Sequence, residues 1–151
     1  MIGALKALFE RPDAESAEDL AHRLQLASAA LLIETARADF TQDAAEQETM
    51  EALLCTTLKL DEKEVKQLIS RASARVDESI SLYEFTRLIN DHFTMEQKLQ
   101  LVHNMWMVAW ADNSVDKYEE HLIRQVAELT YVPHQDYIRS KHQARDKALA
   151  L

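Results

Sequence analysis

The chain has very few of the residues that make tight turns. Its 151 residues include one glycine and two prolines, against averages of about 7% and 5% in globular proteins. A sheet of many short strands needs turn residues at regular intervals, and a phosphate-binding loop needs several glycines. The composition therefore disfavours β-rich folds, excludes a glycine-rich nucleotide loop and is typical of an all-α protein.

Cysteine, long apolar runs and positive charge are also scarce. Cys55 is the single cysteine, so the chain cannot form an internal disulfide and suits a reducing compartment. No run of eighteen apolar residues occurs, and the first ten residues lack the basic start and long apolar core of a signal peptide. We therefore expect a cytoplasmic protein with no membrane insertion. The net charge is −9, and the small basic stretch from Arg139 to Lys147 is too short to follow a phosphate backbone, so nucleic acid is not an expected partner.

An internal repeat organises what is present. Residues 109–119, AWADNSVDKYE, align without a gap with residues 36–46, ARADFTQDAAE, so that two alanines, two aspartates and a glutamate match. On both sides of this stretch, apolar residues of one copy align with apolar residues of the other. Because a repeat dictates architecture, we expect a single domain over 1–151 with two related helical halves, roughly 16–76 and 94–147, bridged by a helix over 81–93.

Apolar spacing and cap residues predict a compact bundle of about eight helices. Residues 2–10 place Ile2, Leu5, Leu8 and Phe9 on one helical face, which fits either a packed first helix or a hydrophobic docking arm. The stretch from Thr94 to Trp110 is apolar almost all round, which is typical of a helix at the centre of a bundle. Six of the expected helices open with side chains that cap helix N-termini: Ser16, Asp43, Asp61, Ser81, Thr94 and Asp116.

The repeated stretch is acidic and has two interpretations. Asp112, Asp116 and Glu119 stand at one helix-turn-helix corner, where three carboxylates with water and backbone carbonyls suit a hard divalent cation. The same spacing is also that of an ordinary capping box from Asp116 to Glu119, with an Asx turn at Asp112. An EF-hand loop is excluded, because Lys117 stands at the position of its glycine and Ile123 at that of its last glutamate.

The first half holds the matching acids Asp39, Asp43 and Glu46, which form a partner corner if the halves are related by a two-fold axis. Among six scattered histidines none forms a zinc motif, and His121, just past Glu119, is the one that could add a nitrogen ligand. No nucleophile with its base is apparent. We therefore predict no catalytic residue and no enzyme.

Four motifs in order resemble the TerB family of bacterial proteins: SLYEFTRLIN at 81–90, AWAD at 109–112, DKYEEH at 116–121 and YVPH at 131–134. The resemblance implies an all-α fold of two related bundles, a link to tellurite resistance and chemical stress, and a divalent-metal site at an Ala-Asp-Gly turn. Asn113 stands where the family has glycine, and asparagine tolerates the left-handed conformation. In the first half Phe40 replaces that glycine, which makes the same turn strained.

Two functions from different classes follow. The first is a non-enzymatic TerB-like module that binds a divalent metal ion, calcium, magnesium, manganese or zinc, at Asp112, Asp116 and Glu119 or at Asp39, Asp43 and Glu46. It would act in the tellurite and chemical stress response with other proteins of a stress-response complex. The second is a metal-free protein–protein interaction scaffold that uses the hydrophobic helix from Ile2 to Phe9. The sequence leaves homo-oligomer formation open.

Overall fold

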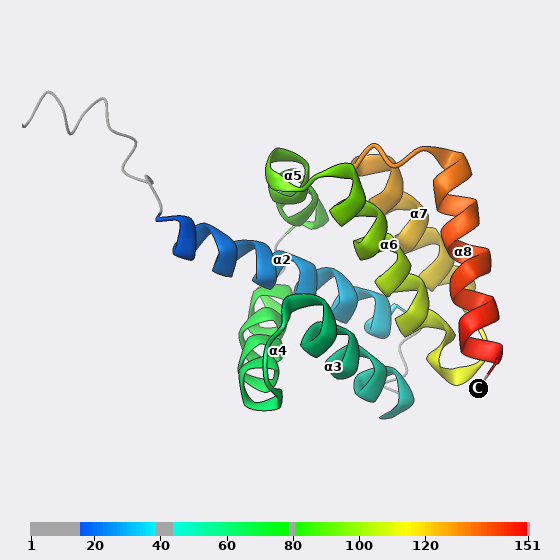
Figure 1. Ribbon diagram of the computed structural model, residues 1–151, viewed down its shortest axis with the longest axis horizontal. Helices are drawn as coiled ribbons and strands as arrows, with labels where there is room; N and C mark the ends of the chain where they lie inside the picture. Colours follow the sequence, from blue (N-terminus) through cyan, green and yellow to red (C-terminus); the bar gives the residue numbers. More distant parts are fainter. Residues whose placement is uncertain (1–15, 39–43, 79–80, 151) are drawn as a thin grey trace, which may run out of the picture.

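The computed structural model describes residues 16–38, 44–78 and 81–150. Within these ranges it contains seven α-helices, one short 3-10 helix and no strand (Figure 1), which confirms the all-α prediction. The expected helix over 2–10 lies outside the described residues, so the total of eight helices stays a prediction. The elements are α2 (Ala17–Arg37), α3 (Ala44–Leu58), α4 (Glu62–Asp77), α5 (Leu82–His92), α6 (Met95–Ala109), η1 (Trp110–Asp112), α7 (Lys117–Leu129) and α8 (His134–Leu149).

Most helices begin where cap residues predict. The Ser16 hydroxyl accepts a hydrogen bond from the Asp19 amide at 3.1 Å at the start of α2. Complete capping boxes open α4, α6 and α7. Ser81 caps α5, and its hydroxyl accepts from the Tyr83 amide at 3.2 Å. A capping box would use the amide of the next residue, Glu84. Asp43, the expected cap of α3, lies outside the described residues.

Helix α2 runs through the middle of the bundle (Figure 1). It packs against α3, α4, α5, α6 and α7, and the seven consecutive residues from Ala27 to Ile33 are all buried. Three of these residues are alanines, whose small side chains allow neighbouring helices to approach closely. The predicted central helix, α6, contacts α2, α3, α7 and α8. The core is therefore built around two helices, α2 and α6, rather than one.

Among the residues that the structure describes, three non-glycine residues adopt the left-handed conformation. Lys59 after α3 has φ 57°, Asn113 after η1 has φ 69° and Tyr131 after α7 has φ 60°. The amide that follows Lys59, and the one that follows Tyr131, each donates to a carbonyl oxygen five residues back, at 3.2 and 2.9 Å. This is the Schellman arrangement, in which glycine usually occupies the left-handed position.

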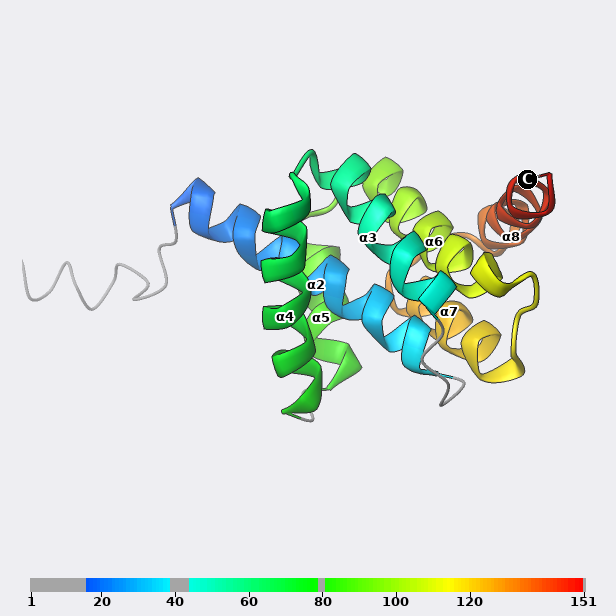
Figure 2. The ribbon, with the colours of Figure 1, turned by 90° about the horizontal axis from the view of Figure 1, so that it is seen from below.

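The starts of α3 and α7 follow the repeat. Helix α3 begins at Ala44 and α7 begins 73 residues later at Lys117, and both end in the same Schellman arrangement. Seen from below (Figure 2), α3 and α6 lie side by side, and α7 lies beyond the end of α2. That the two halves are one unit repeated about a local axis stays a prediction.

Candidate functional site

The predicted helix-turn-helix corner lies between α6 and α7. Helix α6 tightens into η1, Asn113 turns the chain with a left-handed backbone, and Asp116 is the N-cap of α7. The Asn113 amide donates to the Trp110 carbonyl oxygen at 2.8 Å. Asparagine therefore supports the turn at a position where the resemblance implies glycine, as expected from its tolerance of this conformation.

Asp112 makes an Asx turn. Its Oδ1 accepts a hydrogen bond from the Ser114 amide at 3.1 Å, and the Ser114 hydroxyl lies 3.4 Å from the same oxygen. The side chain is partly buried. The carboxylate therefore stabilises the loop that leads into α7.

Asp116 and Glu119 form the capping box. Asp116 Oδ1 accepts from the Tyr118 amide at 2.7 Å, and the Asp116 amide donates to Glu119 Oε1 at 3.0 Å. Glu119 is only 1% exposed, whereas Asp116 is partly exposed. The positive end of the α7 dipole favours both carboxylates at this position.

Glu46 brings the first half to the same corner. It lies in the first turn of α3, is fully buried, and corresponds by the 73-residue repeat to Glu119. Helix α3 packs against η1, and both views place the start of α3 beside the end of α6 (Figures 1 and 2). Two repeat-related helix starts, each with a buried glutamate, therefore belong to one region. The expected partners Asp39 and Asp43 lie outside the described residues.

The donor chemistry of this corner suits a hard cation, but its arrangement is incomplete. Carboxylate oxygens are preferred by calcium and magnesium. In the part of the chain that the structure describes, no three His, Cys, Asp or Glu side chains come together in a group that could hold a metal ion. The physical reason is visible at Asp112 and Asp116, whose carboxylates turn toward nearby backbone amides. That Asp39 and Asp43 add ligands to this corner stays a prediction.

The histidines do not extend the corner. His121 is exposed on α7. His103 on α6 is partly buried, and its pKa is lowered because burial disfavours the charged ring, with a smaller effect from the positive charge of Lys147. Such an environment is typical of a structural histidine within an apolar helix.

The sequence did not reveal a polar cluster between α6, α7 and α8. Trp106 is fully buried, and its ring centroid lies 5.4 Å from that of Tyr137. Lys141 Nζ lies 5.6 Å from the centroid of the Trp106 ring and 2.7 Å from Glu120 Oε1. Burial, together with the Glu120 carboxylate, raises the pKa of Tyr137 to about 12. The Tyr137 phenol therefore stays protonated at neutral pH.

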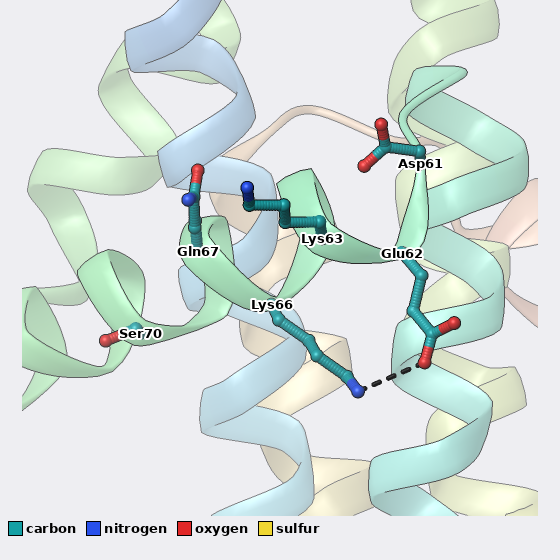
Figure 3. Close-up of a pocket in the computed structure, with 6 residues that line it drawn as sticks. All are labelled: Asp61, Glu62, Lys63, Lys66, Gln67 and Ser70. Atoms are coloured by element: carbon teal, nitrogen blue, oxygen red, sulfur yellow. Dashed lines mark ion pairs between the residues drawn. The ribbon is translucent and has the colours of Figure 1, made fainter.

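Two of the hollows on the described surface bear on the search for a site. One, of about 610 Å³, is lined by six residues of the stretch 61–70 at the start of α4, where Lys66 Nζ lies 3.0 Å from Glu62 Oε1 (Figure 3). Since a single helix lines it, this is an open surface rather than a cleft. The other, of about 440 Å³, is enclosed by α2, α3 and the start of α6. The sequence did not reveal it; Asn104, an amide within the apolar stretch of α6, is the signal that could have indicated it.

These features define an all-helical, acidic domain with a helix-turn-helix corner and a groove between helices. Residues 25–142 match the family model described as tellurite resistance protein TerB, and the chain belongs to the TerB family. No curated protein and no solved structure shows significant similarity to it. Among the described helices, none has the length and apolar character needed to span a membrane.

Proposed function

We propose that the chain is a non-enzymatic TerB-family module that binds a divalent cation weakly at its acidic corner and acts in a cytoplasmic response to tellurite or other chemical stress. The observation that carries the proposal is that Glu46 and Glu119, which occupy equivalent positions of the repeat, are both buried. The repeat places a buried glutamate at the start of both α3 and α7, and α3 packs against η1.

The corner supplies acids for such a site. Asp112 and Asp116 are partly exposed, and their cap hydrogen bonds use Oδ1 of each carboxylate. A carboxylate offers about four lone-pair positions on its two oxygens, so a cap bond is compatible with a cation on the same group. Asp39 and Asp43 would add ligands from the first half. With water as the other ligand, calcium or magnesium fits best, and manganese and zinc are tested beside them.

The role of the ion in this proposal is structural. A bound cation would hold the starts of α3 and α7 together and offset the repulsion between their carboxylates. The TerB family is one of non-enzymatic helical domains, which supports a role in recruiting other proteins of a stress-response complex. A second copy of the chain is an alternative partner.

Calorimetric titration of the metal-stripped protein with the four cations tests the proposal. The key variant combines Asp112→Asn with Asp116→Asn, because asparagine keeps the capping ability and removes only the charge. Asp61→Asn is the matched control, since Asp61 opens the equivalent capping box on α4. Saturable binding that is lost in the double variant and kept in the control supports the site. No heat at millimolar metal contradicts it.

A metal-free scaffold is the second candidate. It is favoured by the hydrogen bonds of Asp112, Asp116 and Glu119, each of which stabilises a turn or helix start. In such a scaffold, the apolar helix from Ile2 to Phe9 would be the surface that binds other proteins. Deletion of residues 1–10 separates the possibilities for that segment. Lost self-association with an unchanged melting temperature supports an arm that binds partners, and a large fall in stability shows that the segment packs on its own chain.

A further inference from the structure

The groove between α2, α3 and α6 has more apolar than polar surface. Its volume is about 440 Å³, and Glu96 is the one charged residue that lines it within the described chain. Leu24, Leu58 and Phe93 on its walls remain partly exposed. The apolar side chains that line it are Leu24, Leu32, Leu54, Leu58, Phe93 and Leu101.

Three of the polar side chains that line the groove, Thr57, Gln100 and Asn104, bond to one another. Gln100 Nε2 donates to Asn104 Oδ1 at 2.9 Å, and Asn104 Nδ2 donates to Thr57 Oγ1 at 3.0 Å. Asn104 is 3% exposed, so a polar ligand would have to break these bonds to reach it, at a cost of about 1–3 kcal/mol for each buried group left unsatisfied. An apolar occupant has no such cost. The groove therefore fits apolar side chains better than a polar small molecule.

The segment before α2 carries a matching apolar stripe. Ile2, Leu5, Leu8 and Phe9 share one face of a helix drawn over residues 2–9. Lys6 is the only charged residue among the first nine, so its sign is opposite to that of Glu96 on the groove. The segment also lies outside the region that matches the family model, residues 25–142.

The connection has the length that docking requires. The α2 side of the groove runs from Ala21 to Leu32, about 16 Å of helix, and eight helical residues cover about 12 Å. The start of α2 stands clear of the other helices (Figure 1), and Ala21 is only about 7 Å along the helix from Ser16. Residues 10–15 can span up to about 20 Å, and Pro12 among them disfavours one continuous helix. A reversal of direction before α2 is therefore feasible.

We propose that residues 2–9 dock as a short helix in the groove of their own chain, antiparallel to α2. The docked helix buries Ile2, Leu5, Leu8 and Phe9 against Leu24 and the other apolar side chains of the groove. The groove lies apart from the acidic corner, so the docking proposal does not depend on metal binding.

Disulfide trapping tests the location. In a Cys55→Ala background, Leu5→Cys is paired with Thr57→Cys on the groove wall and, as the control, with Gln125→Cys on the exposed side of α7. Docking within one chain makes the effective thiol concentration millimolar, so the groove pair is expected to oxidise at least about tenfold faster than the control pair, at a rate independent of protein concentration. Equal rates overturn the proposal. Covalent dimers that increase with protein concentration overturn it as well, because they make a second copy the occupant.

A charge placed on each face of the segment gives an independent test. Leu5→Glu with Leu8→Glu puts two acids on the apolar stripe, whereas Ala7→Glu puts one on the opposite face. The double variant is expected to shift the amide NMR signals of Leu58, Gln97 and the Asn104 side chain and to lower the melting temperature by several degrees. The single variant is expected to leave both unchanged. Spectra of the double variant that match those of the unaltered protein at these positions contradict docking.

Discussion

Replacing Tyr131 by glycine is expected to stabilise the protein. Tyr131 has a left-handed backbone, φ 60°, and its side chain is 76% exposed. The substitution therefore removes an unfavourable conformation and sacrifices little packing. Lys59, which has a left-handed backbone after the C-terminus of α3, offers the same test with an exposed lysine side chain.

The size of the effect follows from two opposing terms. A left-handed backbone costs a residue with a β-carbon about 1–2 kcal/mol. Glycine adds freedom to the unfolded chain, which reduces stability by about 0.4–1 kcal/mol. The net gain is about 0.5–1 kcal/mol for each site, or roughly 1–4 °C in melting temperature for a chain of this length. Asn113→Gly should gain less, since asparagine tolerates the left-handed region.

Urea unfolding followed by tryptophan fluorescence measures these differences, with an unchanged slope required for the comparison. Gln125→Gly is the control, because it places glycine on the exposed face inside α7. That variant should lose about 1 kcal/mol. If Tyr131→Gly and Lys59→Gly lose stability as Gln125→Gly does, the assignment of backbone strain to these two positions is wrong.

Three further substitutions test the corner, the polar cluster and the buried histidine. Asp116→Ala should lower the free energy of unfolding in urea by about 1 kcal/mol through loss of the α7 cap, and no loss would contradict the capping box. Tyr137→Phe should keep or raise stability in the same assay, since the hydroxyl is buried without a hydrogen-bond partner among the described residues, and a loss of more than about 1 kcal/mol would refute this. Because burial lowers the pKa of His103 below 6.5 in the folded chain, the unfolded chain binds the proton more readily, and stability should fall as the pH drops through 6.5 toward the lowered pKa. His103→Gln should flatten that part of the pH profile of stability, and an unchanged profile would contradict the effect.

The features that sequence predicted best are local. Ser16, Asp61 and Thr94 each begin a helix because the side chain accepts a hydrogen bond from the amide three residues later. Neighbouring residues are therefore sufficient to predict these helix starts. The all-α class follows from the scarcity of turn residues in the same way. The left-handed conformation of Asn113 was also predictable, since it depends on the residue's own side chain and on the turn that it occupies.

The features that sequence missed are non-local. Spacing placed Asp112 and Asp116 near one another, but it did not show that each carboxylate turns to its own backbone amide. The burial of Glu46 depends on the packing of α3 against η1, more than sixty positions away in the chain. The groove is lined by three segments between Ala21 and Asn104. The apolar periodicity of one segment does not predict which other segments pack beside it.

The central position of α2 constrains the order in which the chain can fold. The buried run from Ala27 to Ile33 is covered by helices as late as α6 and α7, so an isolated first half would leave part of this run in water. At about 5–20 residues per second of synthesis, roughly 4–15 seconds separate the appearance of Ile33 from that of Ala109 at the ribosome. During that interval the apolar surface of α2 lacks the part of its native cover that α6 and α7 supply. A fragment ending at Asp77 should therefore be prone to aggregation.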